Sequence, residues 1–98
     1  KLIIISCEDP HKFQGMITLY CVPKYPPKRE EIRFDLMKNF NGYSNHIPEV
    51  DILLKAALAG ARIIELHITP TKKLDLPDNP VSFEAKDLKQ NNQTFEVI

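Results

Sequence analysis

The sequence predicts an α/β fold in which parallel strands alternate with crossover helices. Runs rich in Ile, Val, Thr and Tyr alternate with segments whose apolar residues recur at helical spacing. A helix between two strands returns the chain to the same end of the sheet, so that both strands run in one direction. The chain has 98 residues, whereas a closed barrel of eight strand–helix units takes about 250. We therefore expect a partial TIM-type barrel, about half of one.

Four runs are expected to form strands, because β-branched and aromatic residues favour extended backbone. They are residues 2–6, 16–22, 42–44 and 62–68. The first connection is short: Cys7 to Gly15 holds nine residues, and a parallel crossover with its helix takes at least about 10–12. We therefore expect that the first strand is antiparallel or that residues are missing after it.

Three segments are expected to be helical. Residues 26–40 begin with two prolines and residues 48–60 end at a glycine, which suits a helix end. Residues 83–90 follow Ser82, a residue type that caps helices. The second helix is expected to share one apolar face formed by Val50, Leu53, Leu54, Ala57 and Ala61.

Composition limits the function classes. The 13 basic residues balance 13 acidic ones, which argues against nucleic-acid binding. The longest apolar run, residues 2–5, is far shorter than a membrane span or a secretory signal. Two cysteines fit a reducing compartment, so we expect a cytoplasmic location. We expect residues 1–98 to form a single structural unit. Because the chain starts at Lys1 and not at Met, we expect this end to be processed or a cut edge.

Side chains alternate along residues 62–69, and the pattern indicates a site. Ile64, Leu66 and Ile68 are expected to pack against helices. The opposite set would line the barrel interior: Ile63, Glu65, His67 and Thr69. A buried glutamate or histidine is unfavourable unless it is paired, binds a ligand or holds a metal. Glu65 and His67 are therefore candidate site residues.

Four candidate residues fall at the carboxyl ends of neighbouring strands, where α/β folds bind ligands. They are Tyr25, Ser44, His46 and His67. Parallel neighbours about 4.8 Å apart would bring both imidazoles to one rim, where they could share one ion. Structural roles stay open for each: a hydrogen-bonded histidine, a tyrosine packed in a proline turn, and a serine that satisfies backbone groups.

Two other reactive side chains are interpreted as structural. His11 lies in a loop beside Asp9 and Pro10 and is expected on the surface. Cys21 follows an apolar strand, and a buried free cysteine usually packs as a small hydrophobe instead of acting as a nucleophile.

Several segments resemble the sialic acid synthase family. The family's barrel carries Gly-Tyr-Ser-Asp-His, and this chain has Gly42-Tyr43-Ser44-Asn45-His46. The similarity continues through residues 56–61 and 63–69, through Pro77-Asp78, and through residues 82–88. Residues 19–26 are similar to the family's His-Cys-x-x-x-Tyr-Pro segment. Together the likeness covers residues 16–90.

The resemblance implies condensation of phosphoenolpyruvate with N-acetylmannosamine or a related amino sugar, giving a sialic acid and phosphate. His46 and His67 match the family's metal-binding histidines, and the metal that the family favours is manganese. Ser44 matches a phosphoenolpyruvate contact, and Tyr25 and Asp78 match residues at the sugar. Glu65 would either contact the metal-binding side chains without binding the metal itself, or orient solvent. The family also implies a homodimer.

Departures from the family pattern leave the substrate open. Asn45 stands where the family usually has Asp, and Pro23 replaces a polar residue. Leu76 and Asn79 replace the usual Gly and His around Pro77-Asp78. The family's first half-barrel, with its glutamate, glutamine and lysine ligands, and its antifreeze-like C-terminal domain have no counterpart in residues 1–98.

Two other functions stay open. Four strands cannot close a barrel, so the chain could be a non-catalytic barrel remnant that acts as an assembly module. Two histidines would also suit another metal-dependent aldolase on the same barrel.

Overall fold

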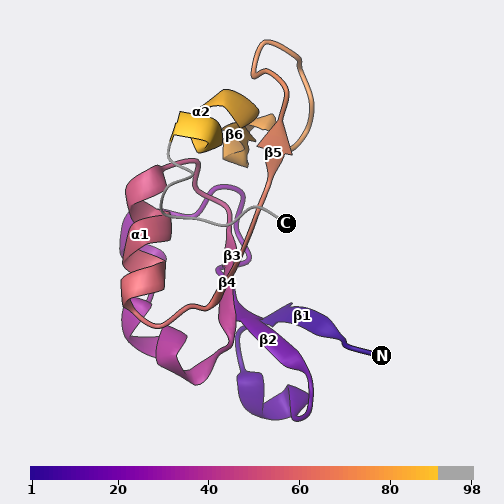
Figure 1. Ribbon diagram of the computed structural model, residues 1–98, viewed down its shortest axis with the longest axis vertical. Helices are drawn as coiled ribbons and strands as arrows, with labels where there is room; N and C mark the ends of the chain where they lie inside the picture. The colour runs from indigo at the N-terminus through magenta and orange to yellow at the C-terminus, as the bar shows by residue number, and fades with distance from the viewer. Residues whose placement is uncertain (91–98) are drawn as a thin grey trace.

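Four parallel strands form the main sheet of the computed structural model, which describes residues 1–90 (Figure 1). The strands are β1 (Ile4–Cys7), β2 (Ile17–Tyr20), β3 (Gly42–Asn45) and β4 (Ile63–Leu66). They lie side by side in sequence order, which is the order of strands in a barrel wall. The predicted α/β class with parallel strands is confirmed.

The first connection overturns one of the two expectations, the antiparallel strand, whereas missing residues after β1 stay a prediction. β1 pairs with β2 in parallel, with Ile4 opposite Ile17 and Cys7 opposite Tyr20. The crossover contains no α-helix; a single 3-10 turn, η1 (Pro10–Phe13), reverses the chain, and Gly15 completes the reversal at φ 83°. The antiparallel alternative is therefore wrong, because a 3-10 turn needs fewer residues than the helical crossover assumed from the sequence.

The segment between β2 and β3 forms two 3-10 helices where one helix was predicted. They are η2 (Arg29–Glu31) and η3 (Phe34–Asn39), separated by extended backbone at Ile32. The amide of Arg33 donates to the hydroxyl of Tyr20 at 3.0 Å, so this amide is diverted from a continuous helix. The apolar residues of the segment are nevertheless buried as the spacing predicted: Ile32, Met37 and Phe40.

The helix α1 (Val50–Leu58) forms where it was predicted, but only part of the predicted face is buried, namely Leu53 and, beyond the helix, Ala61. Ile52, Leu53 and Ala56 are buried, whereas Leu54 and Ala57 are exposed. Ile52 and Ala56 belong to the main hydrophobic cluster. Gly60, with φ 110°, lies just after the helix, as expected.

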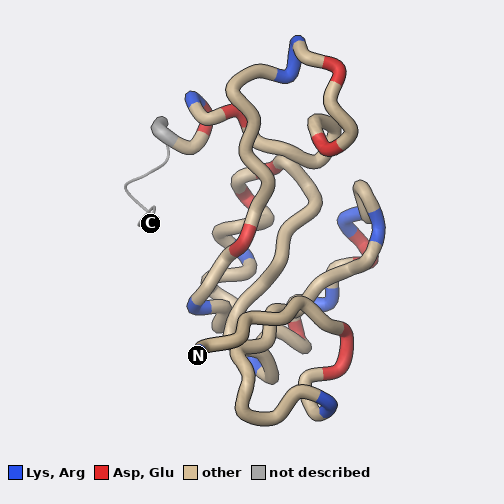
Figure 2. The backbone as a smooth tube through the Cα atoms, turned by 90° about the vertical axis from the view of Figure 1, so that its right-hand side faces the viewer, with Lys and Arg blue, Asp and Glu red and all other residues tan. Residues whose placement is uncertain are grey.

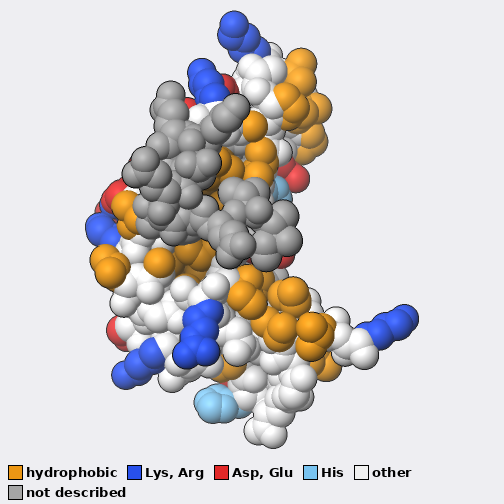
Figure 3. Space-filling model, in the orientation of Figure 1, with side chains coloured by type: hydrophobic (Ala, Val, Ile, Leu, Met, Phe, Trp, Pro, Cys, Tyr) orange, Lys and Arg blue, Asp and Glu red, His pale blue; other side chains and the backbone are white. Residues whose placement is uncertain are grey.

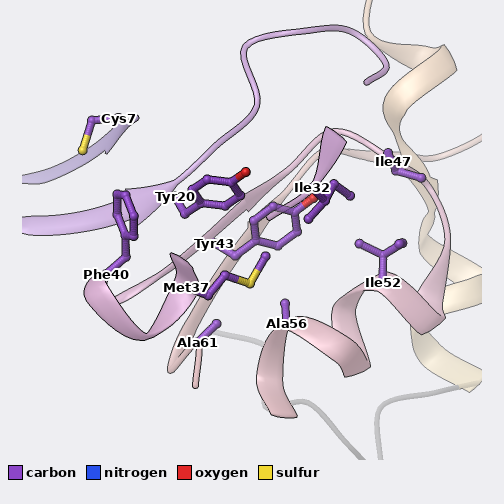
Figure 4. Packing of buried hydrophobic residues seen from close by; sticks show 10 residues of the cluster. All are labelled: Cys7, Tyr20, Ile32, Met37, Phe40, Tyr43, Ile47, Ile52, Ala56 and Ala61. Carbon is purple, nitrogen blue, oxygen red and sulfur yellow. The ribbon is translucent and has the colours of Figure 1, made fainter. Parts of the chain in front are cut away.

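The core lies between the sheet and the layer formed by α1 and η3 (Figure 4). The Tyr20 and Tyr43 rings stack at 6.2 Å, and Phe40 meets Tyr20 edge-on at 5.4 Å. Ile52 and Ala56 point from α1 toward these rings. Because side chains alternate along a strand, Ser44 and Glu65 lie on the opposite face of the sheet.

The C-terminal part differs from the prediction in two ways. The fourth predicted strand is divided into β4 and β5 (Ile68–Thr69), and β5 pairs in parallel with β6 (Phe83–Glu84). The last helix, α2, therefore spans only Ala85–Gln90. The Ser82 hydroxyl does not cap it, because Ser82 Oγ donates to the Asp78 carbonyl at 2.6 Å.

The remaining 3-10 helix, η4 (Asn79–Val81), directly precedes β6. Basic and acidic residues are interspersed along the described chain (Figure 2), and several pair, such as Arg33 with Asp35 at 2.8 Å. Within residues 1–90, no helix is both long and apolar enough to cross a membrane.

Candidate functional site

Ser44 and Glu65 are the part of the candidate site that the sheet register builds. They lie directly opposite each other on β3 and β4, and Ser44 Oγ donates to Glu65 Oε1 at 2.7 Å. Ser44 is buried and Glu65 is exposed. A glutamate on the strand face that was predicted to line the barrel interior needs a hydrogen-bond partner or contact with solvent. The Glu65 carboxylate has both, because it accepts a hydrogen bond from Ser44 and is exposed.

His46 follows β3 directly and is 6% exposed. Its Nδ1 lies 3.2 Å from the Val22 carbonyl oxygen, which belongs to the segment after β2. The Tyr25 ring covers the imidazole, with the ring centres 4.3 Å apart and the planes tilted by 39°. Two neighbouring strands therefore hold His46 at their carboxyl ends.

His67 is the single residue between β4 and β5, and its side chain lies near those of His46 and Tyr25. Its ring centre lies 5.6 Å from that of His46 and 6.4 Å from that of Tyr25, which it meets edge-on. The two imidazoles are thus neighbours, as the strand spacing predicted. Their functional roles stay predictions.

Asp78 approaches His67 from the loop after β5. Asp78 Oδ2 lies 3.7 Å from His67 Nδ1, and the Asp78 side chain is 65% exposed. The six predicted site residues therefore lie in two adjacent sets. One is the Ser44–Glu65 pair, and the other comprises Tyr25, His46, His67 and Asp78.

Ion pairs hold the segment that carries Tyr25 against α1. Lys24 pairs with Glu31, and Arg29 binds both Glu49 and Asp51 at the start of the helix. The hydrogen bond from Arg29 lowers the pKa of Asp51 below its usual value. All of these side chains are at least partly exposed, so solvent screens the pairs and each adds little to the stability of the fold.

Cys21 lies on the face of the sheet that carries Ser44, and it is 9% exposed. Burial, followed by the nearby Glu8 carboxylate, raises the pKa of its thiol. The thiol therefore stays protonated at neutral pH, which supports its interpretation as a packed hydrophobe. His11 is exposed on η1, in agreement with its placement on the surface.

Sequence reasoning missed two contacts that shape the site. One is the Val22 carbonyl, which no residue pattern indicates because any residue supplies a carbonyl. The other is Asn45, which is fully buried and donates from Nδ2 to the Ile47 carbonyl at 2.7 Å. An asparagine at the end of a strand was a usable signal, because buried amides bind nearby backbone groups.

The donor set can be compared with what a metal ion needs. Residues 1–90 contain no group of three His, Cys, Asp or Glu side chains that could hold an ion. Two neighbouring imidazoles are nevertheless suitable ligands for a transition metal. The residues therefore fit an ion that takes its other ligands from substrate, water or another part of the assembly.

A cavity of about 340 Å³ lies between the loop after β5 and the start of η4. It is lined by Lys72, Lys73, Leu74, Asp75, Leu76, Asn79 and Pro80. None of the predicted site residues lines it. The chemistry argued from the histidines therefore concerns the rim of the strands and not this cavity.

The strand order and the side chains at the carboxyl ends define a class: an α/β barrel segment with polar side chains grouped at one end of its strands. The sequence model of the NeuB family matches residues 4–97. The chain therefore belongs to the NeuB family.

Two relatives of this chain are named as synthases. The chain is 32% identical over 92 residues to an N,N'-diacetyllegionaminic acid synthase of Campylobacter jejuni, a match that covers 87% of this chain and 28% of that protein. The synthase of the same name from Legionella pneumophila is 27% identical over 87 residues, which cover 82% of this chain and 24% of that protein.

A solved structure has the same fold. It is an N-acetylneuraminic acid synthetase from Leptospira borgpetersenii in complex with citrate, similar with a TM-score of 0.72 and 32% identity. The match covers 82% of this chain and 30% of that one. The chain thus corresponds to less than a third of each of these proteins.

Proposed function

We propose that the chain forms part of a synthase that condenses phosphoenolpyruvate with N-acetylmannosamine, or a related amino sugar, to give a sialic acid and phosphate. The observation that carries the proposal is the grouping of Tyr25, His46 and His67 at the carboxyl ends of neighbouring parallel strands. Membership of the NeuB family supports it. The assembly proposed is a cytoplasmic homodimer.

A divalent ion, which we propose to be manganese, would polarise the open-chain sugar aldehyde as a Lewis acid. His46 and His67 would be its protein ligands. The exposed Tyr25 hydroxyl and the Asp78 carboxylate would orient the sugar, since both groups can bind sugar hydroxyls. These four side chains already lie together at one rim.

Ser44 and Glu65 would act on the other substrate. The Ser44 hydroxyl has one proton, which it donates to Glu65 in the structure. Turned toward the phosphate of phosphoenolpyruvate, the same hydroxyl would release the Glu65 carboxylate. Glu65 would then accept a hydrogen bond from a water molecule and orient it.

The proposed condensation has three steps. The enol carbon attacks the aldehyde carbon, and the aldehyde oxygen takes a proton as the new carbon–carbon bond forms. Water adds to the resulting oxocarbenium carbon and loses a proton. The tetrahedral intermediate then expels phosphate and leaves the keto acid.

The test uses a chimera, because the chain spans 28% of the Campylobacter jejuni relative. Residues 16–90 replace the matching segment of that synthase, and phosphate release from phosphoenolpyruvate is measured with several amino sugars. We expect the chimera to release phosphate, and we expect the same chimera with His46→Ala to release none. A folded chimera that releases no phosphate with any amino sugar contradicts the proposal, and condensation with pyruvate instead would indicate an aldolase.

A second candidate function is an assembly module. Exposed apolar side chains gather at the N-terminal edge of the sheet, over β1 and β2 (Figure 3). Leu2, Ile3, Ile4 and Met16 are 38–87% exposed. Such a patch is typical of a surface that another protein segment covers.

A further inference from the structure

In both His46 and His67 the same ring nitrogen, Nδ1, lies near an oxygen atom that can only accept a proton. For His46 the acceptor is the Val22 carbonyl, 3.2 Å from Nδ1. For His67 it is the Asp78 carboxylate, 3.7 Å from Nδ1. The first acceptor belongs to the backbone and cannot be removed by a side-chain substitution, whereas the second can.

An acceptor at Nδ1 decides which nitrogen carries the proton. A neutral imidazole has one N–H and one lone pair, and a carbonyl or carboxylate oxygen can only accept. Both rings are therefore favoured in the form with the proton on Nδ1 and the lone pair on Nε2. Free histidine in water prefers the opposite tautomer, so the acceptors change the ring's intrinsic preference.

The backbone at Asp78 is firmly held although its side chain is exposed. Its carbonyl accepts from the Val81 amide at 3.1 Å and from Ser82 Oγ at 2.6 Å. Val81 and Ser82 are buried, and the Phe83 amide donates to the His67 carbonyl at 2.9 Å. The segment that follows Asp78 is thus tied to the backbone of His67, the residue that the carboxylate approaches.

We infer that Asp78 is a positioning residue for His67: its carboxylate keeps the proton on Nδ1, so that His67 presents the Nε2 lone pair to a ligand as His46 does. At 3.7 Å the contact is longer than a hydrogen bond, so the carboxylate acts mainly through its charge. The use of the lone pairs rests on the proposed function, but the tautomer does not.

The tautomers are measured by long-range ¹⁵N–¹H NMR on the metal-free 98-residue chain, at alkaline pH where imidazoles are neutral. In the unmodified chain we expect the Nδ1–H form for both rings. Asp78→Ala should move His67 toward the Nε2–H form and leave His46 unchanged. The matched control is Asp75→Ala, an exposed carboxylate of the same loop, which should move neither ring.

Three results would overturn the inference: a His67 tautomer that Asp78→Ala does not change, an equal change in His46, or the same change in Asp75→Ala. Binding of Mn²⁺ is a separate readout, and Asp78→Ala should weaken it about 10-fold, as loss of an orienting partner does. A change of tautomer without Mn²⁺ binding by any variant would contradict the proposed function and leave the positioning role standing.

Discussion

Gly42 is the residue at which β3 and β4 leave no room for a side chain. A Cβ atom at this position would overlap the carbonyl oxygen of Ile63, a backbone atom that cannot turn aside. We expect Gly42→Ala to lower the free energy of unfolding by about 3 kcal/mol, because overpacking against backbone forces the strands apart. Urea unfolding measures the effect.

Gly15 is the control for this substitution. It has open space around it and a φ of 83°, so Gly15→Ala adds only backbone strain, about 1 kcal/mol. If the two variants lose the same free energy of unfolding, the close approach of β3 and β4 at Gly42 is not the reason why a side chain is unfavourable there.

Three buried groups make stability depend on alkaline pH. Burial raises the pKa of the Cys7 and Cys21 thiols from an ordinary 9.0, and that of the Tyr43 hydroxyl from an ordinary 10.0. The folded chain therefore keeps protons that the unfolded chain releases above about pH 9. The free energy of unfolding should be unaffected by these groups below that pH and should fall as the pH rises further.

Urea unfolding at a series of pH values from about 8 to about 10.5 tests this dependence. Tyr43→Phe removes the phenol and should make the fall at the upper end shallower. A stability that stays constant throughout would show that these groups ionise equally easily in the folded chain.

The sequence located the two histidines well because strand ends of parallel neighbours must meet. Once β3 and β4 pair in parallel, His46 and His67 follow the two strands at the same end of the sheet. It could not locate the contact of His67 with Asp78, because that contact depends on the path of the ten residues between them, which include β5 and the loop after it. The Ser44–Glu65 hydrogen bond needed the exact pairing of β3 and β4, which residue types alone do not define.

At the scale of elements, α1 is stabilised by one buried face. Leu53 is fully buried, whereas Leu58 on the same helix is 89% exposed. Leu53→Ala should lower the free energy of unfolding by about 2–5 kcal/mol, because it leaves a cavity in the core. Leu58→Ala is the matched control and should change it by less than about 0.5 kcal/mol. Comparable losses would contradict the buried face.

Strands and α1 were predictable because local pattern and tertiary packing agree in them. The segment between β2 and β3 was not, because the Tyr20 hydroxyl, 13 residues away from Arg33, takes an amide that a longer helix would use. The same holds for β6, which exists only because it pairs with β5. Elements that depend on a distant partner are not visible in local periodicity.

For the whole molecule, the apolar patch at the β1 edge predicts self-association. We expect sedimentation velocity at micromolar concentration to show species larger than a monomer. Ile3→Lys combined with Ile4→Lys should shift the chain toward the monomer, since both residues are more than half exposed in the patch. Leu58→Lys is the control, because that exposed leucine lies on α1, away from the edge. A monomer for the unmodified chain would contradict the assembly function.

The central claim is that the strand ends form one ligand site around His46 and His67. Titration of Mn²⁺ followed by electron paramagnetic resonance tests it most directly, on the unmodified chain and on His46→Ala, His67→Ala and His11→Ala. We predict weaker binding in the first two variants and unchanged binding in the third, because His11 lies on η1. Equal binding in all four proteins, or no binding in any, would contradict the claim.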